Sequence, residues 1–327
     1  MKNTVYYLKD KEHFITKTYE LPTLKSQYVR VKNLYCGICG SDYSAYLGRR
    51  AKYNISLGHE FVSKVIGVGE DVHGFKLDDI VVSDFNYRCG QCRYCSTGHS
   101  HLCEKNDIEL FDNRAFADYS DIQYSYLIPI NSIHDNLISA TCIEPLSCVI
   151  HAVNRAAINS NDKVLIVGNG NIGTLAAFYL RIILHVDDVY VIDKIDQKSD
   201  QLVHFFDCKL YTENIIPDII LEATNEMDGL MYAISKSIRG GRISSMSHLY
   251  GVDTSLAYNE IIKNEIDIKY PLRNGDKENI INASQYIAQY WEKEFNSMFE
   301  LSNLADINGT FGNKIKSSYN RQIISIV

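Results

Sequence analysis

A short apolar run followed by spaced glycines constrains the fold more than any other segment of this chain. The run Val164–Val167 leads directly into Gly168, Gly170 and Gly173, and a helical stretch follows at 172–184. Glycines at this spacing, between a strand and a helix, permit a tight turn and let the backbone approach a pyrophosphate at the helix N-terminus. The segment therefore predicts a dinucleotide-binding loop. The residues expected to contact the dinucleotide are Gly168, Gly170, Asn171, Ile172 and Gly173.

A carboxylate follows at the position that selects between the two nicotinamide dinucleotides. The apolar run Val189–Ile192 ends in Asp193, twenty residues after Gly173. A carboxylate there can accept a hydrogen bond from the 2′-hydroxyl of the ribose, and it repels a 2′-phosphate. Asp193 therefore favours NAD over NADP, and the neighbouring Lys194 softens that preference slightly.

Strands and helices alternate through the second half of the chain. Further apolar runs at Ile219–Glu222 and Arg242–Ser245 indicate βαβ units and a parallel sheet, which makes the chain an α/β protein with a Rossmann domain. The segment between Asp193 and Ile219 is short, so we expect little room there for a full crossover helix. Before residue 150 the pattern is rich in strands, and a helical stretch (278–289) and a last strand (322–327) are expected near the end.

Four cysteines lie within fifteen residues, at positions Cys89, Cys92, Cys95 and Cys103. Turns of the Cys-x2-Cys type bring two sulfurs to one point, and tetrahedral zinc takes four such ligands. Four thiolates leave no open coordination position, so the spacing predicts a structural zinc ion. The alternatives are free or disulfide-bonded cysteines and an iron–sulfur cluster. His99 and His101 lie within this lobe and are expected to be solvated.

A second set of metal ligands is spread along the chain. Cys39 precedes Gly-Ser-Asp42, His59-Glu60 follows twenty residues later, and Glu144 comes much later. Cys39, His59 and one or two carboxylates would form a catalytic zinc site with a position left for water or substrate. Zinc there lowers the pKa of a bound alcohol, and the carbon of the alkoxide then becomes a hydride donor.

Neighbouring residues have predicted supporting roles at that site. Asp42 is placed to accept the second ring N–H of His59, and Ser41 can pass the alcohol proton outward. Cys36 is the alternative to Cys39, which we prefer because it directly precedes the Gly-Ser-Asp turn. The carboxylate ligand stays open between Glu60, Glu144 or both.

The net charge of −7 argues against a general binder of nucleic acid or anionic membranes. The most apolar stretch is far shorter than the roughly 20 residues of a membrane span. The first dozen residues are charged and lack the apolar core of a signal peptide, so the expected location is the cytoplasm. Nine cysteines without an export signal indicate reduced thiols or metal thiolates.

Taken in order, the Cys39–Asp42 segment, Gly58–Glu60, the four-cysteine lobe and the glycine loop resemble the medium-chain zinc-dependent alcohol dehydrogenases. Two further segments are similar to the sorbitol (polyol) dehydrogenase branch of that superfamily. They are Ile143–Ser147 followed by 150–152, and Glu265–Lys269 followed by Arg273.

That resemblance implies a GroES-like catalytic domain built from residues 1–149 and 275–327, with the structural zinc lobe at 86–106. Residues 150–274 would form the Rossmann NAD-binding domain. It also implies a homodimer or homotetramer with two zinc ions per chain. The catalytic zinc would be bound by Cys39, His59 and Glu60, with Glu144 as a further ligand or as the holder of the zinc-bound water. Substrate contacts are expected at Tyr46 and Arg273.

Two departures from the branch concern its substrate. Ser44 stands where the branch often has a proton-relay histidine, and the gap from Cys39 to His59 is shorter than usual. The leading prediction is reversible oxidation of a secondary alcohol of a polyol to a ketone, with hydride transfer to NAD. A polyol phosphate is an alternative, because Arg49, Arg50 and Lys52 can grip a phosphate or form a solvated loop.

Two further alternatives stay open. One is a dehydrogenase of simple alcohols or amino alcohols, and the other is a zinc-stabilised, NAD-binding regulatory protein without catalytic activity. The last would need the four-cysteine lobe but not Cys39, His59 and Glu144 together.

Overall fold

The structure is a computed structural model that describes residues 1–49, 53–86, 88–105, 114–130, 133, 135–249, 255–313 and 317–326. The chain forms two compact units. One contains Met1–Glu144, Asp276–Ser317 and Arg321–Val327, and the other contains Pro145–Gly275 and Ser318–Asn320. The chain passes from the first unit to the second between residues 144 and 145, whereas the sequence predicts this boundary at residue 149. Near the end of the chain, the three residues Ser318–Asn320 belong to the second unit again.

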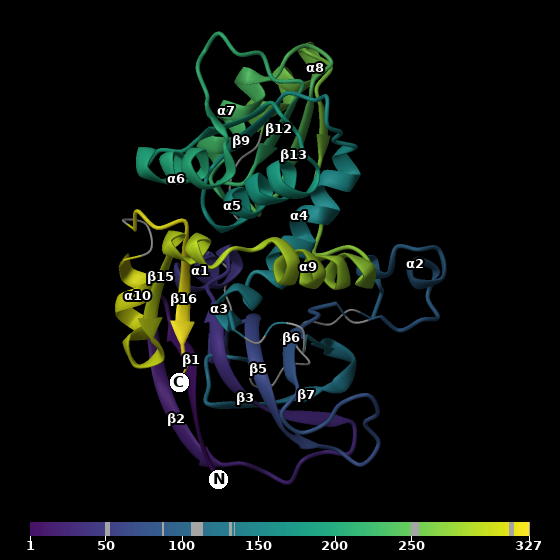
Figure 1. Cartoon of the computed structure of the whole chain (residues 1–327), viewed down its shortest axis with the longest axis vertical. Helices are drawn as coiled ribbons and strands as arrows, with labels where there is room; N and C mark the ends of the chain where they lie inside the picture. Colours follow the sequence, from purple (N-terminus) through teal and green to yellow (C-terminus); the bar gives the residue numbers. More distant parts are fainter. Residues whose placement is uncertain are drawn as a thin grey trace. The chain divides into compact units, whose positions relative to one another are not determined.

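The first unit contains a seven-stranded sheet in which segments distant in sequence lie side by side (Figure 1). Strands β15 and β16 are parallel, and the remaining pairs are antiparallel. Strand β7 (Tyr119–Gln123) pairs with β3 outside the main path. The main path runs through β15 (Phe299–Asn303), β16 (Arg321–Ser325), β3 (Tyr28–Gly37), β5 (Glu60–Val68), β6 (Ile80–Ser83) and β8 (Leu127–Pro129).

A smaller sheet of the same unit has the order β2 (His13–Glu20), β1 (Lys2–Asp10) and β4 (Ile55–Ser56). Aromatic residues fill the core beside it. The ring of Phe14 stacks on Tyr46 with centroids 5.8 Å apart and lies 5.0 Å from Phe311. The α-helices of the unit are α1 (Gly40–Tyr46), α2 (Arg93–Ser96), α3 (Leu137–Ala140), α9 (Lys277–Tyr290) and α10 (Ile307–Asn313).

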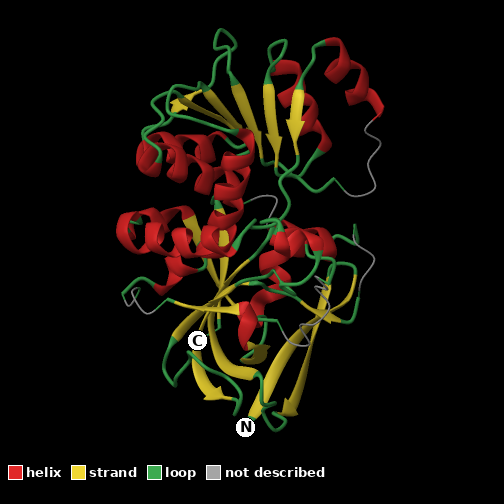
Figure 2. Ribbon diagram, turned by 90° about the vertical axis from the view of Figure 1, so that its right-hand side faces the viewer, coloured by secondary structure: helices red, strands yellow, loops and turns green. Residues whose placement is uncertain are grey.

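The second unit is built on a parallel sheet with helices along it (Figure 2). The run Val164–Val167 is buried at all four positions, as expected for a strand covered on both faces. The strand order is β11 (Lys209–Leu210), β10 (Val189–Ile192), β9 (Val164–Val167), β12 (Ile219–Glu222), β13 (Arg242–Ser245) and β14 (Asp267–Lys269). The helices are α4 (Ile143–Ala156, which begins in the first unit), α5 (Asn171–Phe178, continued by a π-helix at Tyr179–Ile183), α6 (Asp196–Phe206), α7 (Met227–Lys236) and α8 (Ser255–Lys263).

One expectation was wrong in this unit. The segment after Asp193 does contain a crossover helix, α6, which has eleven residues. Eleven residues of α-helix span roughly 16 Å, and four-residue strands such as β10 span roughly 13 Å. A short helix is therefore long enough to return the chain along short strands.

Helices that combine the length and the apolar character needed to cross a membrane are absent from the part of the chain that the structure describes.

Candidate functional site

A buried cluster in the first unit brings together Cys39, His59 and Glu60. One ligand atom from each residue lies within 4.8 Å of the other two. Antiparallel pairing of β3 and β5 places Gly37 opposite Glu60, and Cys39 follows directly as the N-cap of α1. His59 and Glu60 are only 8% and 1% exposed. The register of the sheet therefore assembles this cluster from segments that are apart in sequence.

Asp42 lies in the first turn of α1, beside the imidazole of His59. Its Oδ2 accepts a hydrogen bond from the backbone N–H of Cys39 at 3.3 Å, and its Oδ1 is 3.5 Å from Nδ1 of His59. The latter distance suits an ion pair and is longer than a hydrogen bond. Burial by itself lowers the pKa of His59, but the negative charges of Asp42 and Cys39 outweigh it and raise that pKa well above its usual value.

An arginine that sequence reasoning missed holds the carboxylate of the cluster. Nη2 of Arg321 lies 2.9 Å from Oε2 of Glu60 and donates to the backbone oxygen of Thr141 at 2.8 Å. Both charged side chains are 1% exposed. A Cβ at Gly37 would collide with this guanidinium and would lie 2.6 Å from Oε2 of Glu60, so only glycine leaves room for the pair. The signal in the sequence was a single arginine at the start of the last apolar run.

Glu144 lies in the first turn of α4, at the edge of this cluster. Its carboxylate is not among the ligand atoms that lie within 4.8 Å of one another. Burial raises its pKa to about 7; Glu60 and Asp84 add to this rise, whereas His59 and Arg321 oppose it. The structure therefore groups Glu60, and not Glu144, with Cys39 and His59.

The cluster fits a zinc ion. A thiol, an imidazole and a carboxylate are the ligand types of mixed zinc sites, and tetrahedral ligands about 2.1–2.3 Å from zinc lie roughly 3.5 Å apart. Three buried carboxylates, those of Asp42, Glu60 and Glu144, belong to this region, and the buried guanidinium of Arg321 pairs with one of them, Glu60. A divalent cation would offset this surplus of acidic groups.

The other residues predicted near the cluster have distinct environments. Ser41 is half-buried in the first turn of α1, and Ser44 is buried in the same helix. Cys36 is fully buried, its thiol donates to the backbone oxygen of Gly37 at 3.4 Å, and burial raises its pKa. Cys36 does not belong to the ligand group, whereas Cys39 does.

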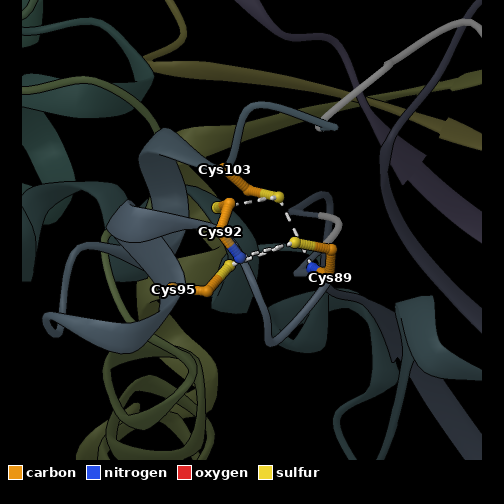
Figure 3. A group of neighbouring side chains, drawn as sticks. All are labelled: Cys89, Cys92, Cys95 and Cys103. Atoms are coloured by element: carbon orange, nitrogen blue, oxygen red, sulfur yellow. Dashed lines mark hydrogen bonds between the residues drawn. The ribbon is translucent and has the colours of Figure 1, made fainter.

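The four-cysteine lobe forms a second cluster in the same unit, with its side chains turned toward one another (Figure 3). Two pairs of sulfur atoms, Cys89 with Cys95 and Cys92 with Cys103, are 3.9 Å apart. This separation is about twice the length of a disulfide bond. The backbone N–H of Cys92 donates to the sulfur of Cys89, and that of Cys89 donates to the sulfur of Cys103. Backbone N–H groups also lower the pKa of Cys92 to about 6, which favours its thiolate, whereas burial raises the pKa of Cys95 to about 12.

One expectation for this lobe was wrong. His99 is exposed, but His101 is 4% exposed rather than solvated. The lobe is also tied to its surroundings, because Arg88 pairs with Asp84 and the hydroxyl of Ser100 donates to Asp276, the N-cap of α9.

In the second unit, the glycine loop lies between β9 and α5. Gly168 has φ +92°, a left-handed value that favours glycine, and a Cβ there would lie 2.8 Å from Cγ2 of Thr224. Helix α5 begins at Asn171 with Gly170 as its N-cap. The loop therefore presents the N-terminus of a helix, which is a binding position for phosphate groups.

Asp193 lies beside this loop. Its Oδ2 accepts from the backbone N–H of Asn169 at 2.6 Å, and its Oδ1 accepts from that of Ile195 at 2.9 Å. Sequence reasoning missed Asn320, whose side-chain amide donates to the backbone oxygen of Asn169 at 2.7 Å and to that of Lys198 at 3.3 Å. Asn320 belongs to the three-residue segment that returns to this unit.

The residues predicted to contact a substrate lie in different environments. Tyr46 is 5% exposed within the aromatic core, so it offers little surface to a substrate. Arg273 is half-buried near the end of the second unit and has φ +60°. Arg49 is exposed, and Arg50 and Lys52 lie outside the described residues.

Parts of this chain are similar in sequence to known dehydrogenases. Residues 25–132 match the alcohol dehydrogenase GroES-like domain. A sorbitol dehydrogenase of Halalkalibacterium halodurans is 36% identical over 168 residues, which cover 50% of this chain and 49% of that protein. An L-threonine 3-dehydrogenase of Caldanaerobacter subterraneus is 28% identical over 249 residues, 69% of this chain and 70% of that protein. The match to sorbitol dehydrogenase covers about half the length of that protein. A match to D-arabinitol dehydrogenase 1 of Uromyces fabae also covers about half the length of its relative.

Solved structures show the same fold over nearly the whole chain. An alcohol dehydrogenase of Escherichia coli CFT073 complexed with NADH has a TM-score of 0.84 at 21% identity, covering 99% of both chains. Galactitol-1-phosphate dehydrogenase of Escherichia coli has a TM-score of 0.83 at 18% identity, covering 98% of this chain and 99% of that chain. The predicted fold class, a GroES-like domain with a Rossmann domain, is confirmed. Residues 25–132 therefore form an alcohol dehydrogenase GroES-like domain, and the whole chain has the fold of solved medium-chain dehydrogenases.

Proposed function

We propose that this protein is a zinc-dependent, NAD-linked dehydrogenase that reversibly oxidises a secondary alcohol of a polyol to a ketone. The observation that carries the proposal is the buried cluster of Cys39, His59 and Glu60 in a chain that also has a dinucleotide loop. A regulatory protein that needed zinc only for stability would have no use for this second, buried set of ligands.

The roles of the residues follow from their contacts. Cys39, His59 and Glu60 would hold the catalytic zinc, with Glu144 beside them. Asp42 orients the imidazole of His59. When bound, zinc supplies a Lewis acid that favours the alkoxide, and NAD supplies the hydride acceptor.

Proton movement is assigned to groups near that cluster. The carboxyl group of Glu144, with a pKa raised to about 7, can exchange a proton near neutral pH. The half-buried hydroxyl of Ser41 would pass the alcohol proton toward solvent. Four thiolates would saturate a zinc ion at Cys89, Cys92, Cys95 and Cys103, so we assign the lobe a structural role.

The dinucleotide is assigned to the second unit. We propose that Gly168, Gly170, Asn171, Ile172 and Gly173 cradle the pyrophosphate and that Asp193 accepts the ribose 2′-hydroxyl. Asp193→Ser should therefore raise turnover with NADP relative to NAD by at least about tenfold, since it removes a repulsive charge. Greater turnover of the unmodified protein with NADP than with NAD would refute the role given to Asp193.

The polyol substrate is supported by similarity to relatives named sorbitol dehydrogenase and D-arabinitol dehydrogenase. Two other substrates have specific support. The longer match to L-threonine 3-dehydrogenase favours an amino alcohol, and the fold of galactitol-1-phosphate dehydrogenase, with Arg49 exposed, favours a polyol phosphate. We propose Arg273 as a contact for substrate hydroxyls and a homodimer or homotetramer as the assembly.

A substrate screen tests the proposal. Reduction of NAD and of NADP is measured with sorbitol, arabinitol, galactitol 1-phosphate, L-threonine and 2-propanol, with and without a zinc chelator. We expect NAD reduction with a polyol, lost on chelation and restored by added zinc, and two zinc ions per chain. One zinc per chain, with none lost in His59→Ala, would contradict the proposal. Turnover with L-threonine alone would mean that the substrate is an amino alcohol and not a polyol, and it would leave the proposed mechanism unchanged.

A further inference from the structure

A buried carboxylate in the second unit lies outside every role assigned above. Glu222 is the last residue of β12 and is 0% exposed. Burying a carboxylate is costly unless hydrogen bonds replace the water around it. The donors around Glu222 are neutral, one backbone N–H and three hydroxyls, and all of them come from the segments that end or follow β12 and β13.

These four hydrogen bonds divide between the two carboxylate oxygens. Oε1 accepts from the N–H of Thr224 at 2.8 Å, from the hydroxyl of Thr224 at 2.6 Å and from that of Ser247 at 2.7 Å. Oε2 accepts from the hydroxyl of Ser245 at 2.7 Å. Hydrogen bonds to an ionised acceptor are stronger than neutral ones, so one side chain fixes the conformation of two adjacent loops.

Further contacts join the two loops to each other. The backbone N–H of Asn225 donates to the hydroxyl of Ser247 at 2.6 Å, and the side-chain oxygen of Asn225 accepts from the backbone N–H of His248 at 3.0 Å. Asn225 has φ +58°, a left-handed conformation that asparagine tolerates better than most residues. Both loops leave the carboxyl ends of parallel strands, the edge at which such sheets bind ligands.

Thr224 connects this arrangement to the glycine loop. A Cβ on Gly168 would lie 2.8 Å from Cγ2 of Thr224, so the threonine packs directly against the first glycine. The preceding residue, Ala223, donates its N–H to the backbone oxygen of Val167 at 2.9 Å, immediately before that glycine. The loop after β12 thus supports the glycine loop from the β12 side, whereas Asp193 contacts it from the β10 side.

We propose that Glu222 is a positioning residue for the dinucleotide, which acts through Thr224 and Ser247 to hold the glycine loop in its binding conformation. This inference rests on the proposed binding of NAD to the second unit. Glu222 itself would not contact the dinucleotide, because its carboxylate is buried and occupied by four donors.

The test compares Glu222→Gln with Glu213→Gln, an exposed glutamate of the same unit whose side chain is 73% exposed. The dissociation constant of NADH is measured by its fluorescence, on folded protein well below each thermal midpoint. Glu222→Gln should weaken binding at least tenfold, because it removes the charge that strengthens these hydrogen bonds and puts an amide nitrogen at one of the two oxygen positions, whereas Glu213→Gln should leave it unchanged. A purely structural role would lower the midpoint without changing the dissociation constant of the folded protein.

Two milder variants keep the test decisive if Glu222→Gln fails to fold. Thr224→Val keeps the shape of the side chain, Ser247→Ala removes one hydroxyl, and each should weaken NADH binding about threefold. The double variant Glu222→Gln/Thr224→Val should bind within twofold of Glu222→Gln alone, because the hydroxyl of Thr224 has already lost its charged acceptor.

The outcomes separate this inference from the proposed function. If the unmodified protein binds neither NADH nor NADPH, the proposed function fails. If it binds NADH and all the variants bind within twofold of it, or if the effects of the double variant multiply, the positioning role of Glu222 is wrong.

Discussion

The two candidate zinc clusters of the first unit differ in what holds their ligands in place. The ligands of the four-cysteine lobe all come from one fifteen-residue segment, Cys89–Cys103, and three of the four are half-buried. Their geometry is supported mainly by N–H groups of the same segment. The ligands of the other cluster come from different elements, and the buried pair of Arg321 and Glu60 holds one of them.

We infer from this difference that bound metal would hold the ligands of the lobe in place, whereas the fold itself holds the ligands of the buried cluster in place. A local loop with few buried side chains would depend on four metal–sulfur bonds to fix its shape. The pairing of β3 with β5 and β16 positions Cys39, His59 and Glu60 without such help, so a metal ion bound there would be available for catalysis. Loss of metal should therefore affect stability at the lobe and turnover at the buried cluster.

The largest expected effect is on turnover. Cys39→Ser or His59→Ala should lower kcat/KM at least about 1,000-fold, which is about 4 kcal/mol of transition-state stabilisation. Zinc content should fall from two ions to one while the fold is retained, as measured by metal analysis and circular dichroism. Cys36→Ala is the matched control, because this buried thiol lies outside the ligand group. Loss of zinc in Cys36→Ala but not in Cys39→Ser would reverse the ligand assignment.

The second prediction tests whether the fold builds the buried cluster. Arg321→Ala removes the buried guanidinium that pairs with the carboxylate of Glu60, which should lower the free energy of unfolding by about 3–5 kcal/mol. Urea unfolding of the metal-free protein measures this loss. Lys64→Ala, at an exposed pair with Asp78, should cost less than about 1 kcal/mol. Equal losses in the two variants would mean that Arg321 does not organise the cluster.

The same distinction explains what the sequence could predict. The glycine loop, the strands at Val164–Val167 and Val189–Ile192, and the four-cysteine spacing are local signals, because residues close in sequence decide them. Arg321 and Asn320 carried no such signal. Each acts on a partner far along the chain, Glu60 and Asn169, and only folding brings these partners together.

The two wrong expectations have different causes. The crossover helix α6 was discounted because its segment is short, although short strands need only a short return. His101 was expected in solvent because it lies in the cysteine lobe, but it is 4% exposed, and no periodic pattern in the sequence indicates this burial. Burial that results from loops folding on themselves has no period in the sequence.

The third prediction concerns the four-cysteine lobe. Cys95→Ser should lower the free energy of unfolding by about 2 kcal/mol and speed proteolysis within residues 89–103, because it removes one ligand from a closed zinc site. Turnover at low temperature should stay within a few fold of the unmodified protein. Cys148→Ser, a half-buried cysteine of α4, is the control and should have a small effect. Unchanged stability in Cys95→Ser would mean that the lobe does not hold a structural zinc ion.

The smallest predicted effect is a pH dependence of stability that arises at the buried cluster. Burial raises the folded-state pKa of Glu144 to about 7, whereas an unfolded glutamate has a pKa of about 4.3. The folded protein therefore binds this proton more tightly, and the resulting stability is complete below about pH 4 and lost as the pH rises to 7. In chelator-treated protein, Glu144→Gln should reduce the loss of unfolding free energy over this range, because the amide does not titrate. Urea titrations of both proteins at several pH values measure the difference. Parallel pH profiles would show that the carboxylate of Glu144 is hydrated, and the fold-built cluster would then be less closed to water than its burial implies.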